Sequence, residues 1–323
     1  MRVTFYLPDK YLPDDASRDV WKSGAIRKLE ESGKIACAQC WIYQTWTALA
    51  AAGHDCALSP EIPEDGILIA LSGFFGDSQK FPPGIFFADI VADYLPHPAA
   101  HLHLVQNSAH AARLPNSVFM PLWPHPNLVP RNPERGQTFK NVAFLGDPRN
   151  LAAELHSDEW AAAVQRDLDL QLDIRRADRW HDYSDVDCVL AIRDFTKSRH
   201  PHKPGTKLYN AWLAGVPFIG GRDSAYTTDG HCGVDYLRAD TPEQVFAHLR
   251  RLKGDQRFRT RLVEEGTKSG ARFTPAMTLG RWEKLISETL PAAEREHAAS
   301  SQIRRAFSRA ANRAILGIDR LLR

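Results

Sequence analysis

One continuous stretch, residues 187–221, constrains the fold more than any other part of this chain. It begins with an apolar run at 188–192 and ends with a second one at 216–219. Short, unbroken apolar runs of this kind predict strands buried on both faces, as in a parallel sheet covered by helices. Between them lie a loop broken by prolines and a helical pattern that begins at Thr206, a predicted N-cap. The order strand, loop, helix, strand predicts one unit of a parallel α/β sheet.

The loop between these two strands is strongly cationic. Its single acid is Asp194, and its basic residues are Arg193, Lys197, Arg199, Lys203 and Lys207. In open parallel sheets, ligands bind beyond the carboxyl ends of the strands, where this loop is expected to lie. Lys207 falls in the first turn of the predicted helix, where the helix dipole disfavours a cation unless an anion is near. The pattern predicts a phosphate site, and a solvated basic loop is the alternative.

The same alternation of strands and helices recurs along the chain on both sides of a proline-rich segment. Residues 121–137 contain five prolines and are expected to cross between two domains. Expected strands lie at 2–7, 55–58, 66–71, 86–91, 102–106, 118–120, 141–145, 172–174, 188–192, 216–219 and 234–237. Expected helices lie at 25–31, 42–52, 150–168, 206–214, 242–252, 256–266 and 275–290. Two successive α/β series predict two Rossmann-like domains that face a cleft.

Length and charge set the domain count and exclude one class of partner. At 323 residues the chain exceeds the usual size of one domain, and we expect domains at 1–125 and 138–275, followed by a crossing helix and tail at 276–323. The net charge is +2, but seven arginines against three acids give residues 291–323 a charge of +4, which leaves −2 for the rest. A slightly acidic body is not expected to bind nucleic acid.

Cysteine usage and hydropathy point to a reducing, aqueous environment. Five cysteines are an odd number, and Cys188 falls in a predicted buried strand, so we expect reduced thiols rather than disulfides. Cys37 and Cys40 form a C-x-x-C pair without a second pair at zinc spacing, and we expect no metal. No signal-peptide core or spanning segment is evident, which predicts a cytoplasmic protein.

Residues 93–103 follow a predicted strand and gather one carboxylate and three imidazoles. A general base at this position could reach a substrate hydroxyl, and histidine titrates near neutral pH. Asp93 and His97 are therefore candidates for the catalytic base. The prolines in this segment make an ordinary surface loop the alternative.

The stretch KPGTKLYNAWLAGVPFIGGRDSAY, followed by GVDYLRADTPEQVFAHLRRLKGDQRFRTRLVEEG, resembles the C-terminal domain of GT-B-type glycosyltransferases. LAAAGHDC at 49–56 is similar to a turn of the N-terminal domain in that family. The resemblance implies a nucleotide-sugar donor bound by the C-terminal domain and a glycan or lipid-linked acceptor held by the N-terminal domain. It implies a role in surface polysaccharide synthesis. It does not imply a cofactor or a metal.

The resemblance also implies roles for individual residues. Asn210 occupies the position where many retaining members place a glutamate on the ribose, and His202 lies where their other glutamate would be. Neither acid is present in this chain, which leaves the stereochemical outcome open. The resemblance implies that the donor is approached by Gly146, Arg193, Lys203, Lys207, Ser224 and Tyr226.

Residues 301–323 combine arginines with apolar residues at three- and four-residue steps, which predicts an amphipathic helix. Such a helix suits an anionic membrane surface at the inner face of the membrane, and packing on the body of the protein is the alternative. Two other functions are compatible with the whole sequence: a nucleotide-sugar epimerase of the same architecture, and a non-catalytic glycan-binding or scaffold protein.

Overall fold

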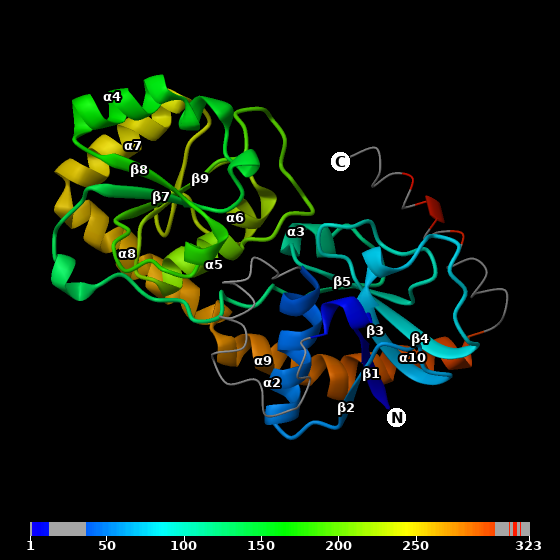
Figure 1. The fold of residues 1–323 in the computed structure, drawn as a ribbon. Coiled ribbons are helices and arrows are strands. Elements are labelled where there is room, and N and C mark those ends of the chain that lie inside the picture. Colours follow the sequence, from blue (N-terminus) through cyan, green and yellow to red (C-terminus); the bar gives the residue numbers. More distant parts are fainter. Residues whose placement is uncertain (1, 13–36, 301–309, 311–312, 315–316, 318–323) are drawn as a thin grey trace.

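The structure is a computed structural model, and it describes residues 2–12, 37–300, 310, 313–314 and 317. The helix predicted at 25–31 and most of the amphipathic helix predicted at 301–323 lie outside the described residues. Within the described part, two parallel sheets with helices form two α/β domains (Figure 1). The predicted fold class is confirmed.

The N-terminal domain is built on a six-stranded parallel sheet with the order β2-β1-β3-β4-β5-β6. Alternate residues of β3 enter different cores, with Ile67 and Ile69 on one face and Leu68 and Ala70 on the other. This explains why the strand is an unbroken apolar run. The strands are β1 (Val3–Tyr6), β2 (Cys56–Ser59), β3 (Asp65–Leu71), β4 (Gly84–Ile90), β5 (Leu102–Val105) and β6 (Ser117–Phe119). The helices are α2 (Gln44–Ala51), which continues a π-helical turn at Gln39–Tyr43, and α3 (Ser108–Ala111).

The C-terminal domain has a five-stranded parallel sheet with the order β11-β10-β9-β7-β8. Its strands are β7 (Asn141–Leu145), β8 (Gln171–Arg175), β9 (Cys188–Ala191), β10 (Phe218–Gly220) and β11 (Leu237–Arg238). Its helices are α4 (Asp158–Leu168), α5 (Thr206–Leu213), α6 (Ser224–Asp229), α7 (Pro242–Gly254) and α8 (Gln256–Gly270). Cys188 and Leu190 of β9 enter one core and Val189 the other, so this strand is also buried on both faces.

Three local predictions are wrong. The helix expected at 150–168 begins only at Asp158, because Ser157 caps it by accepting a hydrogen bond from the Trp160 N–H at 3.2 Å. The strand expected at 234–237 is reduced to Leu237–Arg238, because the preceding residues form a turn. Thr206 is the first residue of α5 rather than its cap, which is Gly205.

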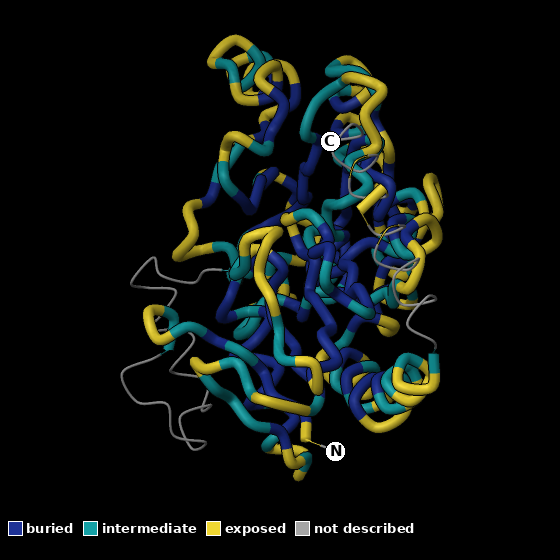
Figure 2. Tube along the Cα trace, turned by 90° about the vertical axis from the view of Figure 1, so that its right-hand side faces the viewer, coloured by how far each residue is buried: buried dark blue, intermediate teal, exposed yellow. Residues whose placement is uncertain are grey.

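The last described helices return to the N-terminal domain. Helices α9 (Pro275–Lys284) and α10 (Leu290–Ala299), joined by a π-helical turn at Leu285–Thr289, pack against the N-terminal domain, with α9 beside α2 (Figure 1). Trp282, Leu285 and Leu290 are buried in the same core as β1 and β3. Figure 2 shows buried segments through the interior and exposed segments at the outer loops and helices. Across the described residues, no helix has both the length and the apolar character needed to span a membrane.

Candidate functional site

The loops and helices that follow β7, β9 and β10 carry most of the predicted site residues. Gly146 directly follows β7, Arg193 lies just beyond β9, and Ser224 begins α6 after β10. Because the carboxyl ends of parallel strands meet at one edge of a sheet, these residues are brought together beside the first turn of α5. This edge faces the N-terminal domain, where α3 packs beside α6 (Figure 1).

Lys207 is a cation of this edge that has no ion-pair partner among the described residues. It lies in the first turn of α5, where the helix dipole opposes its charge. Burial and the nearby Arg193 lower the pKa of Lys207 to about 8, although Asp223 and Asp93 act in the opposite direction. Its Nζ lies 5.4 Å from the centroid of the Phe144 ring, and no carboxylate of the described residues forms an ion pair with it. A bound anion would supply the charge that is missing.

Two further features at this point suit an anion. A Cβ atom added at Gly146 would lie 2.8 Å from Lys207 Cε and 3.1 Å from Nζ, so a side chain there would displace the lysine. The buried Thr206 Oγ1 has no hydrogen-bond partner within the described residues. A hydroxyl and the N–H groups of a helix N-terminus are the donors that phosphate oxygens accept from.

Arg193 is already paired. Its Nε donates to Asp223 Oδ1 at 2.8 Å and its Nη1 donates to Asn150 Oδ1 at 2.8 Å. Burial by itself lowers the pKa of Arg193, but the charge and the hydrogen bond of Asp223 act in the opposite direction and the pKa is raised. The guanidinium therefore stays charged, and the buried Asp223 carboxylate neutralises it.

Lys203 connects the two domains. Its Nζ lies 3.1 Å from Asp93 Oδ1, and the Asp93 carboxylate also accepts a hydrogen bond from Gln106 Nε2 at 3.1 Å. Asp93 lies just beyond β4 and its side chain is 55% exposed. The structure thus places the candidate base of the N-terminal domain beside the cationic loop of the other domain.

His97 does not occupy a comparable position, and its interpretation as a base needs correction. Its ring is buried among Phe75, Phe81 and Phe87. Nε2 lies 3.1 Å from Gly76 O, and Nδ1 accepts a hydrogen bond from the Ala99 N–H at 3.1 Å. Both ring nitrogens are engaged by the backbone, so neither is available to a substrate hydroxyl.

Asn210 is directed toward the crossing segment rather than presented to a ligand. Its Oδ1 accepts a hydrogen bond from the His125 N–H at 3.1 Å, and its side chain interacts with the Tyr183 hydroxyl. Asn210 is buried. The ribose contact implied by the resemblance is therefore not preformed, because the amide links α5 to the segment between the domains.

Ser224 and Tyr226 are likewise engaged within the protein. Ser224 Oγ accepts a hydrogen bond from Asn107 Nδ2 at 2.9 Å. Tyr226 is buried against Phe218, with ring centroids 4.9 Å apart, and burial raises the pKa of its hydroxyl. Both side chains therefore stabilise the edge of the site through contacts within the protein.

Three residues with a role at this edge were not predicted from the sequence: Gln106, Asn107 and Asp223. The first two lie between β5 and α3, and Asn107 is the N-cap of α3. Asp223 follows β10 directly before α6. The available signal was a polar residue immediately beyond a buried parallel strand, which is the usual position of a ligand-binding residue in such sheets.

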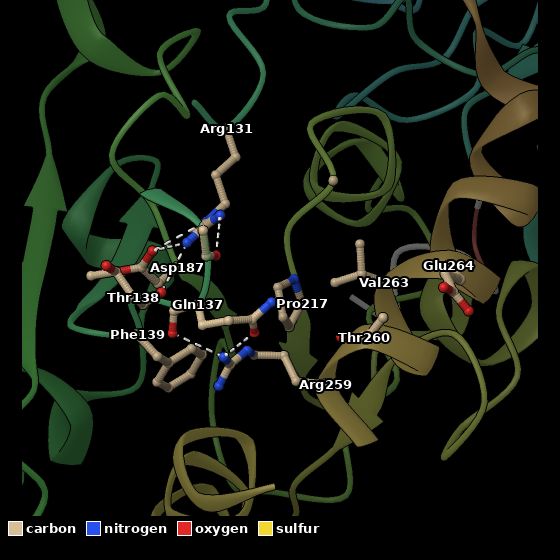
Figure 3. A pocket seen from close by; sticks show the side chains of 12 residues that line it. Arg131, Gln137, Thr138, Phe139, Asp187, Pro217, Arg259, Thr260, Val263 and Glu264 are labelled. Carbon is tan, nitrogen blue, oxygen red and sulfur yellow. Dashed lines mark hydrogen bonds and ion pairs between the residues drawn. The ribbon is translucent and has the colours of Figure 1, made fainter. Parts of the chain in front are cut away.

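A pocket of about 170 Å³ lies elsewhere, at the amino ends of β7, β9 and β10 (Figure 3). Asp187 accepts hydrogen bonds there from Arg131, Arg135 and two backbone N–H groups. Burial alone would raise the pKa of Asp187, but these hydrogen bonds lower it overall. Arg259 donates to Gln137 and to Leu252 O. The charged side chains of this pocket are paired with one another, so the pocket is a structural junction.

No three His, Cys, Asp or Glu side chains of the described residues are grouped to hold a metal ion.

No protein-family model and no curated protein matches this sequence. Among solved structures, Anabaena HepE in complex with UDP and glucose is 13% identical, with 90% of this chain and 99% of that chain covered and a TM-score of 0.56. AviGT4, a glycosyltransferase of avilamycin A biosynthesis, is 13% identical, with 89% and 98% covered and a TM-score of 0.50. The pneumococcal O-GlcNAc transferase GtfA, in complex with UDP and GlcNAc, is 13% identical, with 77% and 60% covered and a TM-score of 0.50. These similarities establish the GT-B fold for this chain.

Proposed function

We propose that this protein is a glycosyltransferase that moves a sugar from a nucleoside-diphosphate donor to an acceptor. The observation that carries the proposal is Lys207, a cation in the first turn of α5 beside Gly146 and Thr206, without a carboxylate partner among the described residues. The similar structures of HepE and GtfA contain UDP, which supports a nucleotide as the anion.

The chemistry assigned to this edge follows from its charges. When the bond between the sugar and the diphosphate breaks, negative charge develops on the leaving diphosphate. Lys207 and the N-terminus of α5 are placed to stabilise that charge, and Lys203 of the cationic loop supplies an additional cation. Asp93, on the N-terminal domain, is the group proposed to accept the proton of the acceptor hydroxyl.

The finer assignments belong to the same proposal. We propose a glycan or lipid-linked acceptor in surface polysaccharide synthesis, a hexosyl or related donor sugar, and activity at the inner face of the membrane. We also propose that transfer needs no metal, because lysine side chains can offset the charge of the diphosphate. Transfer is expected to persist in excess EDTA, and restoration by Mg²⁺ or Mn²⁺ after its loss would contradict that part.

The proposal is tested by thermal unfolding of the full chain with UDP, GDP, ADP, TDP and CMP in turn. A ligand that binds only the folded state stabilises it by about 2.7 kcal/mol at ~100 times its dissociation constant. One nucleoside diphosphate is expected to raise the melting temperature, and Lys207→Ala is expected to abolish that rise.

Lys268→Ala is the matched control, because Lys268 is an exposed lysine of α8 that pairs with Glu265. It is expected to retain the rise in full. Absence of any stabilisation in the wild type would overturn the proposal. Isomerisation of the bound nucleotide sugar without transfer would favour an epimerase instead.

A further inference from the structure

The cationic loop is held in place from both domains, and its last residues before α5 are bound by the N-terminal domain. Pro201 and Pro204 have no N–H group to donate, and His200 has a φ of 42° in the left-handed region. Within the loop, the Lys203 N–H donates to His200 O at 3.0 Å. A segment of this composition forms no regular element, so its carbonyl groups need partners elsewhere.

The Arg199 carbonyl accepts a hydrogen bond from the Ser224 N–H of its own domain at 2.7 Å, whereas the carbonyls of His202 and Lys203 have partners in the N-terminal domain. Gln106 Nε2 donates to His202 O at 3.0 Å, and Asn107 Nδ2 donates to Lys203 O at 2.9 Å. Two consecutive side-chain amides thus bind two consecutive carbonyls across the domain junction. Asn107 Nδ2 also donates to Ser224 Oγ at 2.9 Å, which joins α6 to the same point.

The orientation of the Asn107 amide is fixed from its other end. Its Oδ1 accepts hydrogen bonds from the N–H groups of Ala109 at 2.9 Å and His110 at 3.3 Å, as the N-cap of α3. Asn107 is completely buried. With Oδ1 committed to the cap, Nδ2 has to face the cationic loop, and both of its hydrogens have acceptors.

We infer that Asn107, assisted by Gln106, is a positioning residue that holds Lys203 and the start of α5 in the geometry that binds the donor diphosphate. This inference rests on the proposed function. It makes nucleotide affinity depend on a residue of the opposite domain that touches no part of the nucleotide. The binding geometry is then complete only while the two domains are in contact.

The test uses Asn107→Ser in the full chain. Serine is as good an N-cap as asparagine, so α3 keeps its cap, but the hydroxyl is too short to replace the two donated hydrogen bonds. We expect faster amide hydrogen exchange in residues 199–208 and about tenfold weaker binding of the nucleoside diphosphate identified in the thermal screen. In turnover, the donor KM is expected to rise by a similar factor, with kcat less affected.

Ser108→Ala is the matched control. Ser108 Oγ donates to Asp229 Oδ1 at 2.6 Å, so this variant removes another cross-domain hydrogen bond that does not touch the cationic loop. It is expected to leave exchange in residues 199–208 and nucleotide affinity unchanged. If the two variants alter both quantities equally, the effect is general loosening of the junction and the inference is overturned.

The outcomes separate this inference from the proposed function. Unchanged exchange and unchanged affinity in Asn107→Ser, with binding still lost in Lys207→Ala, would overturn the positioning role and leave the function standing. Failure of the wild type to bind any nucleotide would overturn the role in donor binding together with the proposed function. Hydrogen exchange would then still decide whether Asn107 fixes the loop.

Discussion

The surroundings of Lys207 disfavour its positive charge in several ways. Its position in the first turn of α5, its desolvation by the surrounding protein and its proximity to Arg193 all disfavour the charged form. Glycine at position 146 leaves the space that the lysine occupies. A charge held under these conditions is costly to the fold, and functional sites are where such perturbed groups concentrate.

The lowered pKa of Lys207 predicts that nucleotide binding depends on pH. With a pKa of about 8, Lys207 is mostly protonated at pH 7 and mostly neutral at pH 9. If the anion requires the charged form, the dissociation constant of the nucleoside diphosphate rises on the order of tenfold across this interval. Isothermal titration at pH 7, 8 and 9 measures it.

Lys207→Arg is the control for that titration, because a guanidinium stays charged throughout the interval. Its affinity is expected to be nearly independent of pH, whatever its absolute value. A flat profile in the wild type, or the same slope in Lys207→Arg, would show that another group controls binding.

At the scale of the element, the start of α5 is set by packing rather than by a side-chain cap. Gly205 precedes the helix, and a Cβ atom there would lie 2.4 Å from Tyr209 Cζ and Oη. The Tyr209 ring stacks on Phe273 with centroids 3.7 Å apart and is buried, so it cannot move aside. Glycine at this position lets the helix begin beside Tyr209.

Gly205→Ala is therefore expected to lower the free energy of unfolding by about 1–3 kcal/mol and to abolish nucleotide binding, because the helix N-terminus has to shift. Urea unfolding and the thermal screen measure the two effects. Gly280→Ala is the comparison, since an added Cβ meets no atom within 4 Å on the exposed side of α9. It is expected to preserve binding and to stabilise slightly. Equal behaviour of the two variants would argue against the steric explanation.

At the scale of the whole molecule, strand β1 and helices α9 and α10, which lie far apart in the sequence, belong to the same N-terminal domain. Trp282 is completely buried in the core of the N-terminal domain, and its ring lies 6.1 Å from that of Phe5. His54 Nε2 and Glu283 Oε1 meet at 3.1 Å beside it. The N-terminal sheet thus depends on helices that follow the C-terminal domain in the sequence.

Trp282→Ala is expected to cost about 3–5 kcal/mol and to destabilise the N-terminal domain selectively. Limited proteolysis followed by mass spectrometry is expected to show cleavage within residues 37–120 before cleavage within residues 141–270. Trp282→Phe, which keeps most of the buried volume, is expected to retain more of the resistance to cleavage. Earlier cleavage of the C-terminal domain would contradict this dependence between distant segments.

The sequence by itself determined the order of the strands along the chain, the two-domain α/β fold and the cationic loop between two buried strands. These features depend on local periodicity and on glycine and proline, which act within a few residues. The strand predicted at 141–145 coincides with β7 for this reason. The late start of α4, at Asp158 rather than near residue 150, was not predicted, because Ser157 provides a local cap that competes with the apolar pattern.

Only the tertiary structure decided which charged and polar groups have partners. Arg193 pairs with Asp223, thirty residues away, and Lys203 pairs with Asp93, 110 residues away. His97 and Asn210 have the residue types expected at a site, but His97 Nε2 and Asn210 Oδ1 are engaged by backbone groups of Gly76 and His125 that the fold brings to them. Hydrogen bonds and ion pairs are short-range, so their partners are fixed by the topology of the sheets and the contact between the domains, which local sequence does not specify.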